Sequence, residues 1–271
     1  LAVPLLLPST TSEDDDDGAL SNTSGDAVAV VMFTSGSTGK PKAVPLTHSG
    51  LLWSCRQKLI AHGGKNAVRH GTLAFLPCSH VMGFTNNFLF NLAVARVPFF
   101  VHQMGETQPL CLPVLIDAVK VLQPSIVDTI PSFLEGLSVL LSRGDHAPDL
   151  VQSFAKCERV LYGGCALSTA AIETLSRCRI KVASQYGQTE LGGMILIGEP
   201  HLSADSGNMG EMRAVPGCTW REAADGEFII IDCEAAFCDY VKDGVFPTKR
   251  RSNEHLTGDL FSFRRVVDNG H

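Results

Sequence analysis

The densest group of anion-binding side chains in this sequence lies at residues 34–42, TSGSTGKPK. The stretch follows an apolar, mostly β-branched run at residues 28–32, which predicts a buried strand. Glycines let a backbone turn tightly and approach a ligand, while hydroxyls and backbone amides in such a turn donate hydrogen bonds to an anion. The pattern predicts a loop that binds polyphosphate, although a glycine- and serine-rich surface turn would have a similar composition. The contributing residues are Thr34, Ser35, Gly36, Ser37, Thr38, Gly39, Lys40 and Lys42.

This loop differs from the Walker A pattern, which needs a glycine five positions before the Gly-Lys pair and a hydroxyl residue after the lysine. Thr34 and Pro41 occupy those two positions here, and the proline disfavours a helix that starts at the lysine. TSGSTGKPKA instead resembles the phosphate loop of the adenylate-forming superfamily, which includes acyl-CoA synthetases, luciferases and the adenylation domains of peptide synthetases. Ala43 stands where glycine is commoner in that superfamily.

A second informative stretch, SQYGQTELGG, spans residues 184–193 and follows a predicted strand. Ligands of open α/β sheets collect beyond the carboxyl ends of strands, so a ligand loop is expected at such a place. Tyr186 offers a flat face to a purine, Thr189 a hydroxyl, and Glu190 a hard oxygen ligand for Mg²⁺. Taken alone, these residues would also suit a plain turn with a capping carboxylate. YGQTE is similar to the YGxTE signature of the adenylate-forming superfamily, which implies adenine stacking by Tyr186, nucleotide contact at Gly187, phosphate contact by Thr189 and Mg²⁺ coordination by Glu190.

Three weaker stretches follow the order of the same superfamily. YGGCAL at residues 162–167 resembles its glycine-containing loop, which implies that Gly163 and Gly164 line the adenine and acyl pocket; a plain strand-to-helix turn is the alternative. LPCSHVMGF at residues 76–84 resembles its loop that gates the substrate carboxylate, although a lone histidine is more often structural. LTGDL at residues 256–260 resembles its TGD element, in which the carboxylate of Asp259 would accept from both ribose hydroxyls. The substrate pocket is accordingly expected to involve His80, Met82, Gly83, Asn87 and Cys165, and the catalytic residues to be Lys42, His80, Thr189 and Glu190.

These candidate sites require a scaffold in which strands alternate with helices. Apolar runs predict strands at residues 28–33, 43–46, 72–76, 97–101, 125–130, 159–162 and 180–184. Amphipathic segments predict helices that include residues 49–62, 113–122 and 168–178, with Thr47 and Ser168 as N-caps. The alternation predicts an α/β fold with layered, largely parallel sheets and flanking helices.

The chain is expected to divide into three regions. Residues 1–26 contain the acidic run EDDDD and predict a linker or the remnant of a preceding region. Residues 27–198 hold the alternating strands and helices, with the phosphate loop and adenine site. Residues 199–271 carry short apolar runs with Gly and Asp turns, which predict a smaller β-rich subdomain. The superfamily continues into a hinge and a mobile C-terminal domain with a catalytic lysine, so we expect this chain to be incomplete at both ends.

Composition narrows the class of protein. The 45% hydrophobic and 18% charged residues are ordinary for a globular protein, and the net charge of −6 argues against a nucleic-acid or membrane-surface binder. Nine cysteines without a CxxC pair suggest neither a zinc site nor a disulfide framework, and buried reduced thiols are the simplest account. The start LAVPLLLP is short and interrupted by proline, so no membrane anchor is predicted. We expect a cytoplasmic protein without a nucleic-acid or membrane partner.

The resemblance implies ATP-dependent activation of a carboxylic acid as an acyl-adenylate, with ATP/AMP and Mg²⁺ as the bound groups. In the full-length protein the acyl group would pass to a thiol, either CoA or the phosphopantetheine of a carrier domain. The stretches SGSTGKPKAVPLTH and YGQTE most closely resemble those of fungal synthetase-like and reductase-like multidomain proteins. This resemblance favours a carrier domain in the same polypeptide. Two alternatives stay open: a fragment or degenerate domain that binds nucleotide without turnover, and a stand-alone acyl-CoA ligase or luciferase-like enzyme. One sequence does not identify the acid.

Overall fold

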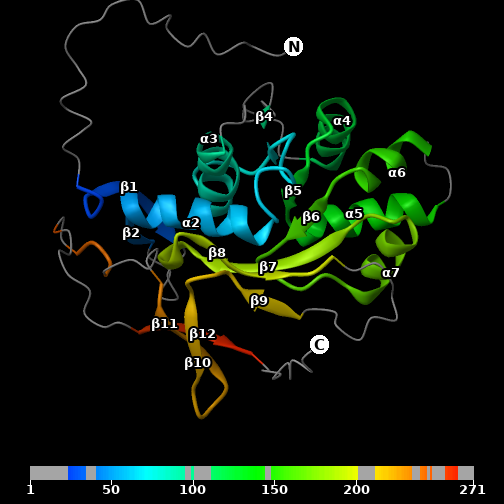
Figure 1. The fold of residues 1–271 in the computed structure, drawn as a ribbon. Coiled ribbons are helices and arrows are strands. Elements are labelled where there is room, and N and C mark those ends of the chain that lie inside the picture. Colours follow the sequence, from blue (N-terminus) through cyan, green and yellow to red (C-terminus); the bar gives the residue numbers. More distant parts are fainter. Residues whose placement is uncertain are drawn as a thin grey trace, which may run out of the picture.

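The computed structural model describes residues 24–34, 41–94, 99–100, 111–143, 148–200, 211–233, 239–242, 245 and 254–261. Its main element is a seven-stranded sheet in the order β4-β3-β5-β6-β7-β8-β9 (Figure 1). The neighbours from β4 to β7 pair in parallel, whereas β7, β8 and β9 pair antiparallel. This arrangement confirms the predicted α/β class with a largely parallel sheet. The strands are β3 (Thr72–Ala74), β4 (Phe99–Phe100), β5 (Ile126–Thr129), β6 (Arg159–Tyr162), β7 (Val182–Gln188), β8 (Gly193–Gly198) and β9 (Met212–Ala214).

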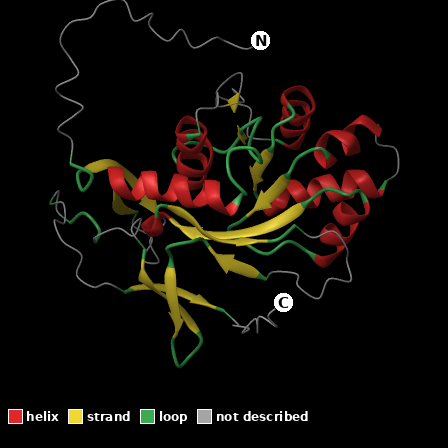
Figure 2. Ribbon diagram, in the orientation of Figure 1, coloured by secondary structure: helices red, strands yellow, loops and turns green. Residues whose placement is uncertain are grey.

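Helices lie against the seven-stranded sheet (Figure 2). They are α2 (His48–Ala61), α3 (Phe90–Ala93), α4 (Leu112–Leu122), α5 (Pro131–Ser142), α6 (Pro148–Ala155) and α7 (Thr169–Arg177). Both predicted N-caps are confirmed: the Thr47 hydroxyl accepts a hydrogen bond from the amide of Gly50, and the Ser168 hydroxyl accepts one from the amide of Ala171. Three of these helices, α4, α5 and α6, carry proline in the first turn, where its missing N–H costs nothing.

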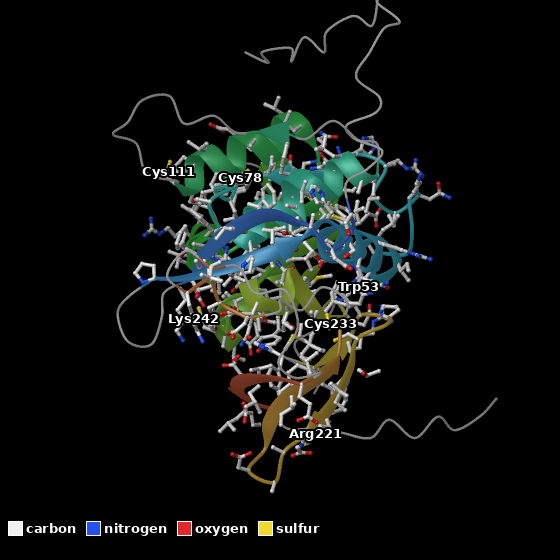
Figure 3. The ribbon with its side chains drawn as sticks, turned by 90° about the vertical axis from the view of Figure 1, so that its left-hand side faces the viewer. Trp53, Cys78, Cys111, Arg221, Cys233 and Lys242 are labelled. Atoms are coloured by element: carbon white, nitrogen blue, oxygen red, sulfur yellow. The ribbon has the colours of Figure 1, made fainter. Side chains whose placement is uncertain are left out.

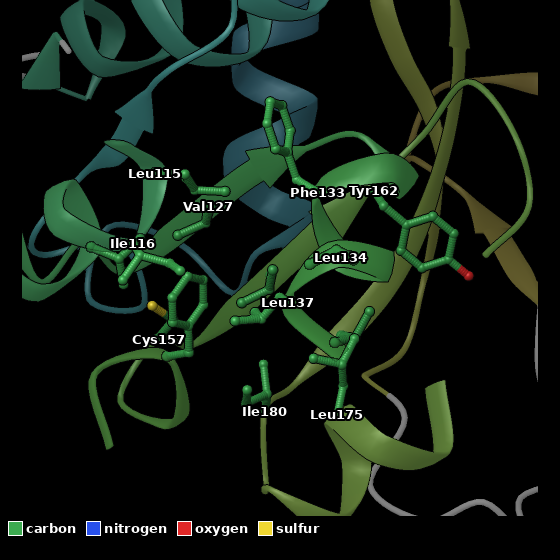
Figure 4. Close-up of a cluster of buried hydrophobic side chains, with 14 of the residues drawn as sticks. Leu115, Ile116, Val127, Phe133, Leu134, Leu137, Cys157, Tyr162, Leu175 and Ile180 are labelled. Carbon is green, nitrogen blue, oxygen red and sulfur yellow. The ribbon is translucent and has the colours of Figure 1, made fainter. Parts of the chain in front are cut away.

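The larger hydrophobic core joins helices α4, α5 and α7 to the parallel strands (Figure 4). Leu115, Val127, Leu134 and Leu175 come from four different elements and are fully buried. Burial of one such side chain contributes about 1.5–3 kcal/mol. This core therefore fixes the positions of the carboxyl ends of β5, β6 and β7.

The phosphate-loop stretch begins and ends in a β-hairpin. Strand β1 (Val28–Thr34) pairs antiparallel with β2 (Lys42–Thr47), and Thr34 lies opposite Lys42 in the register. The strand resumes directly after Pro41 and the helix begins only at His48, as expected for a loop that differs from Walker A. The loop residues Ser35, Gly36, Ser37, Thr38, Gly39 and Lys40 lie outside the described residues.

A separate three-stranded antiparallel sheet is formed by β10 (Thr219–Glu222), β11 (Glu227–Asp232) and β12 (His255–Leu260). Figure 3 shows this sheet projecting from the rest of the molecule, with Arg221 toward its far end and Cys233 nearer the larger sheet. Strand β9 follows residue 198 in the chain but pairs with β8 in the larger sheet. The division into regions at residues 26 and 198 stays a prediction.

Two local expectations were wrong. The SQYGQ segment was expected as a loop, but residues 184–188 belong to β7, because this strand continues as the antiparallel partner of β8. The segment after His80 was also expected as a loop, but Met82–Leu89 form a π-helix, η1, that continues into α3. A π-helical stretch is rare and often accompanies a functional site.

Candidate nucleotide and acyl site

A cavity of about 500 Å³ opens where the β1–β2 hairpin, the ends of β6 and β7, and β12 come together. This volume lies within the range of small-molecule sites. Many of the residues that line it were predicted as site residues: Thr34, Lys42, His80, Met82, Gly163, Gly164, Tyr186, Gly187, Thr189 and Glu190. Leu256 and Thr257 of the LTGDL stretch also line the cavity, so residues of five motifs that are far apart in the chain meet at one hollow.

Of the predicted residues that the structure describes, four do not line this cavity. Asp259 lies beside it, in contact with the wall residue Tyr186. Cys165 is exposed and follows the wall residue Gly164. Asn87 is fully buried and donates hydrogen bonds to Thr72 and Asp128 instead of facing the cavity.

Gly83 has a structural reason to be glycine. A Cβ at this position would overlap the backbone carbonyls of Leu76 and Pro77, so only glycine permits this close approach. The direct pocket role predicted for Gly83 and Asn87 therefore has no support from their positions. Both residues instead fix the π-helix that carries neighbouring wall residues.

The carboxylate of Glu190 is held by a tyrosine that the sequence did not suggest. Glu190 Oε1 accepts a hydrogen bond of 2.8 Å from the Tyr240 hydroxyl. The Tyr240 ring centroid also lies 5.0 Å from Lys42 Nζ, within the range of a cation–π interaction. Burial and the bond to Glu190 raise the pKa of Tyr240, so this hydroxyl stays protonated and acts as the donor. One tyrosine thus joins the candidate metal ligand to the candidate phosphate-binding lysine.

A polar network connects β7 to β12 on another wall. The Tyr186 hydroxyl donates to Asp259 Oδ2 at 2.6 Å, and Gln188 Nε2 lies 3.1 Å from the same oxygen. Gln188 Nε2 also donates to the carbonyl of Thr257, and Gln188 Oε1 lies 2.8 Å from His255 Nε2. Burial, and then the bond to Asp259, raise the pKa of Tyr186. Because these bonds restrain both Tyr186 and Asp259, the residues expected at adenine and ribose have fixed relative positions.

The Tyr186 ring is further packed edge-on against Phe228 and Phe261, with centroids 6.0 and 5.0 Å away. Such contacts hold one side of the ring and limit its rotation. Sequence reasoning missed Gln188, His255 and Tyr240. Gln188 carried a usable signal, since alternation along a strand places it on the same face as Tyr186.

His80 lies on the cavity wall with one ring nitrogen already engaged. Its Nδ1 accepts a hydrogen bond of 3.2 Å from the amide of Met82. In the neutral ring the other nitrogen, Nε2, then carries the proton and is a donor. This geometry suits contact with a carboxylate oxygen.

The donor set fits a magnesium ion that is shared with phosphates. Mg²⁺ is commonly bound by one or two carboxylates together with substrate phosphates and water. Glu190 supplies one carboxylate on the cavity wall, and its Oε2 is not used in the bond to Tyr240. Within the described parts of the chain, no cluster of three or more His, Cys, Asp or Glu side chains is arranged to hold a metal by itself.

The described residues include no helix that is long and apolar enough to cross a membrane.

Comparisons with known proteins match most of the chain. A family model described as AMP-binding enzyme covers residues 3–234. A 4-chlorobenzoate–CoA ligase of Arthrobacter sp. is 28% identical over 167 residues, which are 60% of this chain and 29% of that protein. A 2-succinylbenzoate–CoA ligase of Listeria innocua is 24% identical over 250 residues, 89% of this chain and 50% of that protein.

Solved structures share the fold. The o-succinylbenzoate coenzyme A synthetase of Bacillus subtilis, in complex with ATP and a magnesium ion, superposes with a TM-score of 0.68 at 19% identity. The match covers 88% of this chain and 48% of that one. The chain therefore spans half or less of the length of these three proteins.

Proposed function

This chain belongs to the family of AMP-binding enzymes, and on that premise we propose that it is the nucleotide-binding part of a ligase that activates a carboxylic acid with ATP. The observation that carries the proposal is that four residues line the same cavity: Thr34, Lys42, Thr189 and Glu190. These residues come from the two most specific motifs, TSGSTGKPKA and YGQTE. A hydroxyl pair, a lysine and a carboxylate around one hollow are the groups needed to hold a magnesium-bound polyphosphate.

In the proposed reaction a carboxylate oxygen attacks the α-phosphorus of ATP. The bond between the α- and β-phosphates breaks, and pyrophosphate leaves with the bonding electron pair. Negative charge develops on the phosphate oxygens, where preorganised donors and cations lower the barrier. Lys42 and the hydroxyls of Thr34 and Thr189 would bind these oxygens, and Glu190 would hold Mg²⁺. The metal, when bound, would supply charge neutralisation.

The remaining walls would position the two organic groups. Tyr186, with Gly163, Gly164 and Gly187, would contact adenine, and Asp259 would accept from the ribose hydroxyls. His80, with its Nε2 proton, would orient the acid so that one carboxylate oxygen faces the phosphate. Met82, together with the residues of the larger hydrophobic core that it packs against, would surround the acyl group.

The second half-reaction is proposed to use CoA. The thiol would attack the acyl carbon of the adenylate, forming a thioester and releasing AMP. The two relatives described above are acid–CoA ligases, which supports free CoA as the acceptor rather than a carrier-bound phosphopantetheine. The hypothesis of a multidomain synthetase-like protein with its own carrier domain has no comparable support.

The test is pyrophosphate exchange into ATP by the full-length protein with a panel of carboxylic acids, together with thermal stabilisation by MgATP and AMP. We expect acid-dependent exchange and a rise in melting temperature with either nucleotide. CoA-dependent AMP release would then establish the acceptor. Stabilisation by nucleotides without exchange for any acid would instead favour a binding domain without turnover.

A further inference from the structure

Two buried amide side chains form part of the cavity wall, and the nucleotide contacts proposed above do not use them. Asn86 comes from the π-helix and Gln185 from β7, and they are 4% and 5% exposed. Both line the cavity. Asn86 Nδ2 lies 3.4 Å from Gln185 Oε1, at the long end of the hydrogen-bond range. These two residues are named here as the amide pair.

The orientation of Gln185 is fixed from behind by a carboxylate. Asp128 on β5 is fully buried, and its Oδ1 accepts a hydrogen bond of 3.0 Å from Gln185 Nε2. An ionised carboxylate only accepts hydrogen bonds, so the NH₂ side of the Gln185 amide must face it. The carbonyl oxygen Oε1 is therefore turned toward Asn86 and the cavity.

Lys58 holds the other half of the amide pair. Its Nζ donates to the backbone carbonyl of Asn86 at 2.7 Å and to Asp128 Oδ2 at 3.0 Å. Asn87, the next residue of the π-helix, donates to the same Asp128 oxygen at 2.7 Å. One buried ion pair thus binds α2, β5 and the π-helix together behind the amide pair.

Asn86 is confined from its other side by Gly193. A Cβ at Gly193 would lie 2.9 Å from Asn86 Oδ1, so this oxygen lies close against the start of β8. Nδ2 faces Gln185 and Oδ1 faces β8, which leaves the Asn86 amide little freedom to turn over. The amide pair is therefore a polar patch of fixed orientation on the cavity wall.

We propose that the amide pair recognises a hydroxyl group on the acyl part of the substrate, an inference that rests on the proposed acid activation. Each carbonyl oxygen has two lone pairs, and among the residues that the structure describes Gln185 Oε1 has only the long contact with Asn86. A hydroxyl would donate to such an oxygen, whereas an apolar substrate would bury it without a new partner. An ammonium group fits less well, because Lys58 and Asp128 already balance each other and a further buried charge would be unpaired. The substrate class is therefore a hydroxylated carboxylic acid.

The experiment compares matched acids in which a methyl group replaces the hydroxyl. The pairs are 4-hydroxybenzoate with 4-methylbenzoate, 3-hydroxybenzoate with 3-methylbenzoate, and 6-hydroxyhexanoate with heptanoate. In pyrophosphate exchange by the full-length protein, we expect the hydroxylated member of at least one pair to have a kcat/KM about tenfold or more above its partner. Gln185→Met, which keeps length and removes both polar atoms, should bring that ratio close to one while the KM for ATP stays near the wild-type value.

Gln188→Met is the matched control, because it makes the same change in the same strand but on the nucleotide wall. It should alter the KM for ATP and leave the ratio of hydroxyl to methyl acids as in the wild type. Equal or better use of the methyl acids in every pair would overturn the proposal, and this comparison needs only the wild-type protein. Survival of the preference in Gln185→Met would overturn it as well. If nucleotides bind but no acid of either kind supports exchange, the proposed function fails and the inference falls with it.

Discussion

The Tyr240 hydroxyl donates a hydrogen bond to Glu190 Oε1 at 2.8 Å, while Lys42 Nζ lies over its ring, 5.0 Å from the ring centroid. The segment that carries Tyr240 is held in place by its neighbour, since the amide of Val241 donates to the carbonyl of Ala43 in β2. Tyr240 is thereby fixed to the same hairpin that supplies Lys42. The two charged groups proposed to face the phosphates and the metal therefore share one positioning residue.

Replacing Tyr240 by Phe should lower kcat/KM for MgATP by about 10- to 150-fold. The ring and its contact with Lys42 remain, but Glu190 loses a hydrogen bond of a kind that contributes about 1.5–3 kcal/mol to a charged acceptor. Tyr240→Leu also removes the cation–π contact and should cost a further ~0.5–1 kcal/mol. Pyrophosphate exchange at varied MgATP measures both variants. Wild-type kinetics in Tyr240→Phe would show that Glu190 does not depend on this bond.

Asp259→Ala should weaken the binding of AMP and ATP equally, by about 2 kcal/mol, because the ribose is common to both ligands. The variant also removes the acceptor of the Tyr186 hydroxyl. Calorimetric titration with each nucleotide measures the effect, and Asp225→Ala, an exposed carboxylate in the turn before β11, serves as the control. A loss confined to ATP would mean that Asp259 does not contact the ribose.

Lys42→Ala should weaken the binding of ATP and pyrophosphate and leave the binding of AMP nearly unchanged. The lysine follows the phosphate loop and lines the cavity beside Glu190 and Tyr240, so we expect it to contact the phosphates that AMP lacks. Binding of the three ligands can be compared directly with that of Lys65→Ala, which changes an exposed lysine elsewhere. Equal losses for AMP and ATP would refute this placement of Lys42.

The sequence predicted the site best where a local motif carries the chemistry. Thr34, Lys42, Thr189 and Glu190 lie in short stretches whose residue types and spacing are informative by themselves, and the cavity brings them together. The alternating strands and helices were equally visible, because apolar periodicity depends only on neighbours in the chain. Helix caps at Thr47 and Ser168 follow the same local logic.

Residues placed by tertiary contacts escaped prediction. Tyr240 lies 50 positions after Glu190, in a region without a motif, and only the fold brings them together. Lys58 belongs to α2, whose polar and apolar residues are spread almost evenly around its axis, so the amphipathic pattern expected of residues 49–62 was wrong. Its partner Asp128 is 70 positions away. A lysine in such a helix is normally taken for a solvated residue. The strand character of residues 184–188 was missed because the pairing partner β8 follows the motif instead of preceding it.

Lys58→Met should lower the free energy of unfolding by about 3–5 kcal/mol, because it leaves the Asp128 carboxylate buried without its cation. Both side chains are at most 2% exposed, and burial lowers the pKa of Lys58 while the attraction of Asp128 raises it. Adding Asp128→Asn removes the unpaired charge and keeps an acceptor for Gln185, so the double variant should be more stable than Lys58→Met alone. Urea denaturation of the wild type, both single variants and the double variant measures the coupling. Simple addition of the two single losses would contradict a buried ion pair.

Acidification should destabilise the protein mainly through His62. This ring is buried against Phe90, with centroids 6.0 Å apart, and neither of its nitrogens has a hydrogen bond within the described structure. Burial, followed by the positive charges of Lys58 and Arg159, lowers the pKa of His62 well below 6.5. Below pH 6.5 the unfolded chain then binds a proton that the folded chain does not. Stability should therefore fall as the pH drops from 7 to 5, by up to ~1.4 kcal/mol per pH unit for one such histidine.

His62→Phe should remove most of this pH dependence, since phenylalanine can keep the edge contact with Phe90 and has no proton to bind. His255 should contribute a smaller slope of the same sign, because burial lowers its pKa while the charges of Glu190 and Glu227 oppose the shift. The free energy of unfolding in urea at pH 7, 6 and 5 gives the slope for each protein, with the exposed His70→Gln as the control. If His62→Phe loses stability on acidification as steeply as the wild type and His70→Gln, then His62 does not carry the effect, and its burial as a neutral ring has no consequence for stability between these pH values.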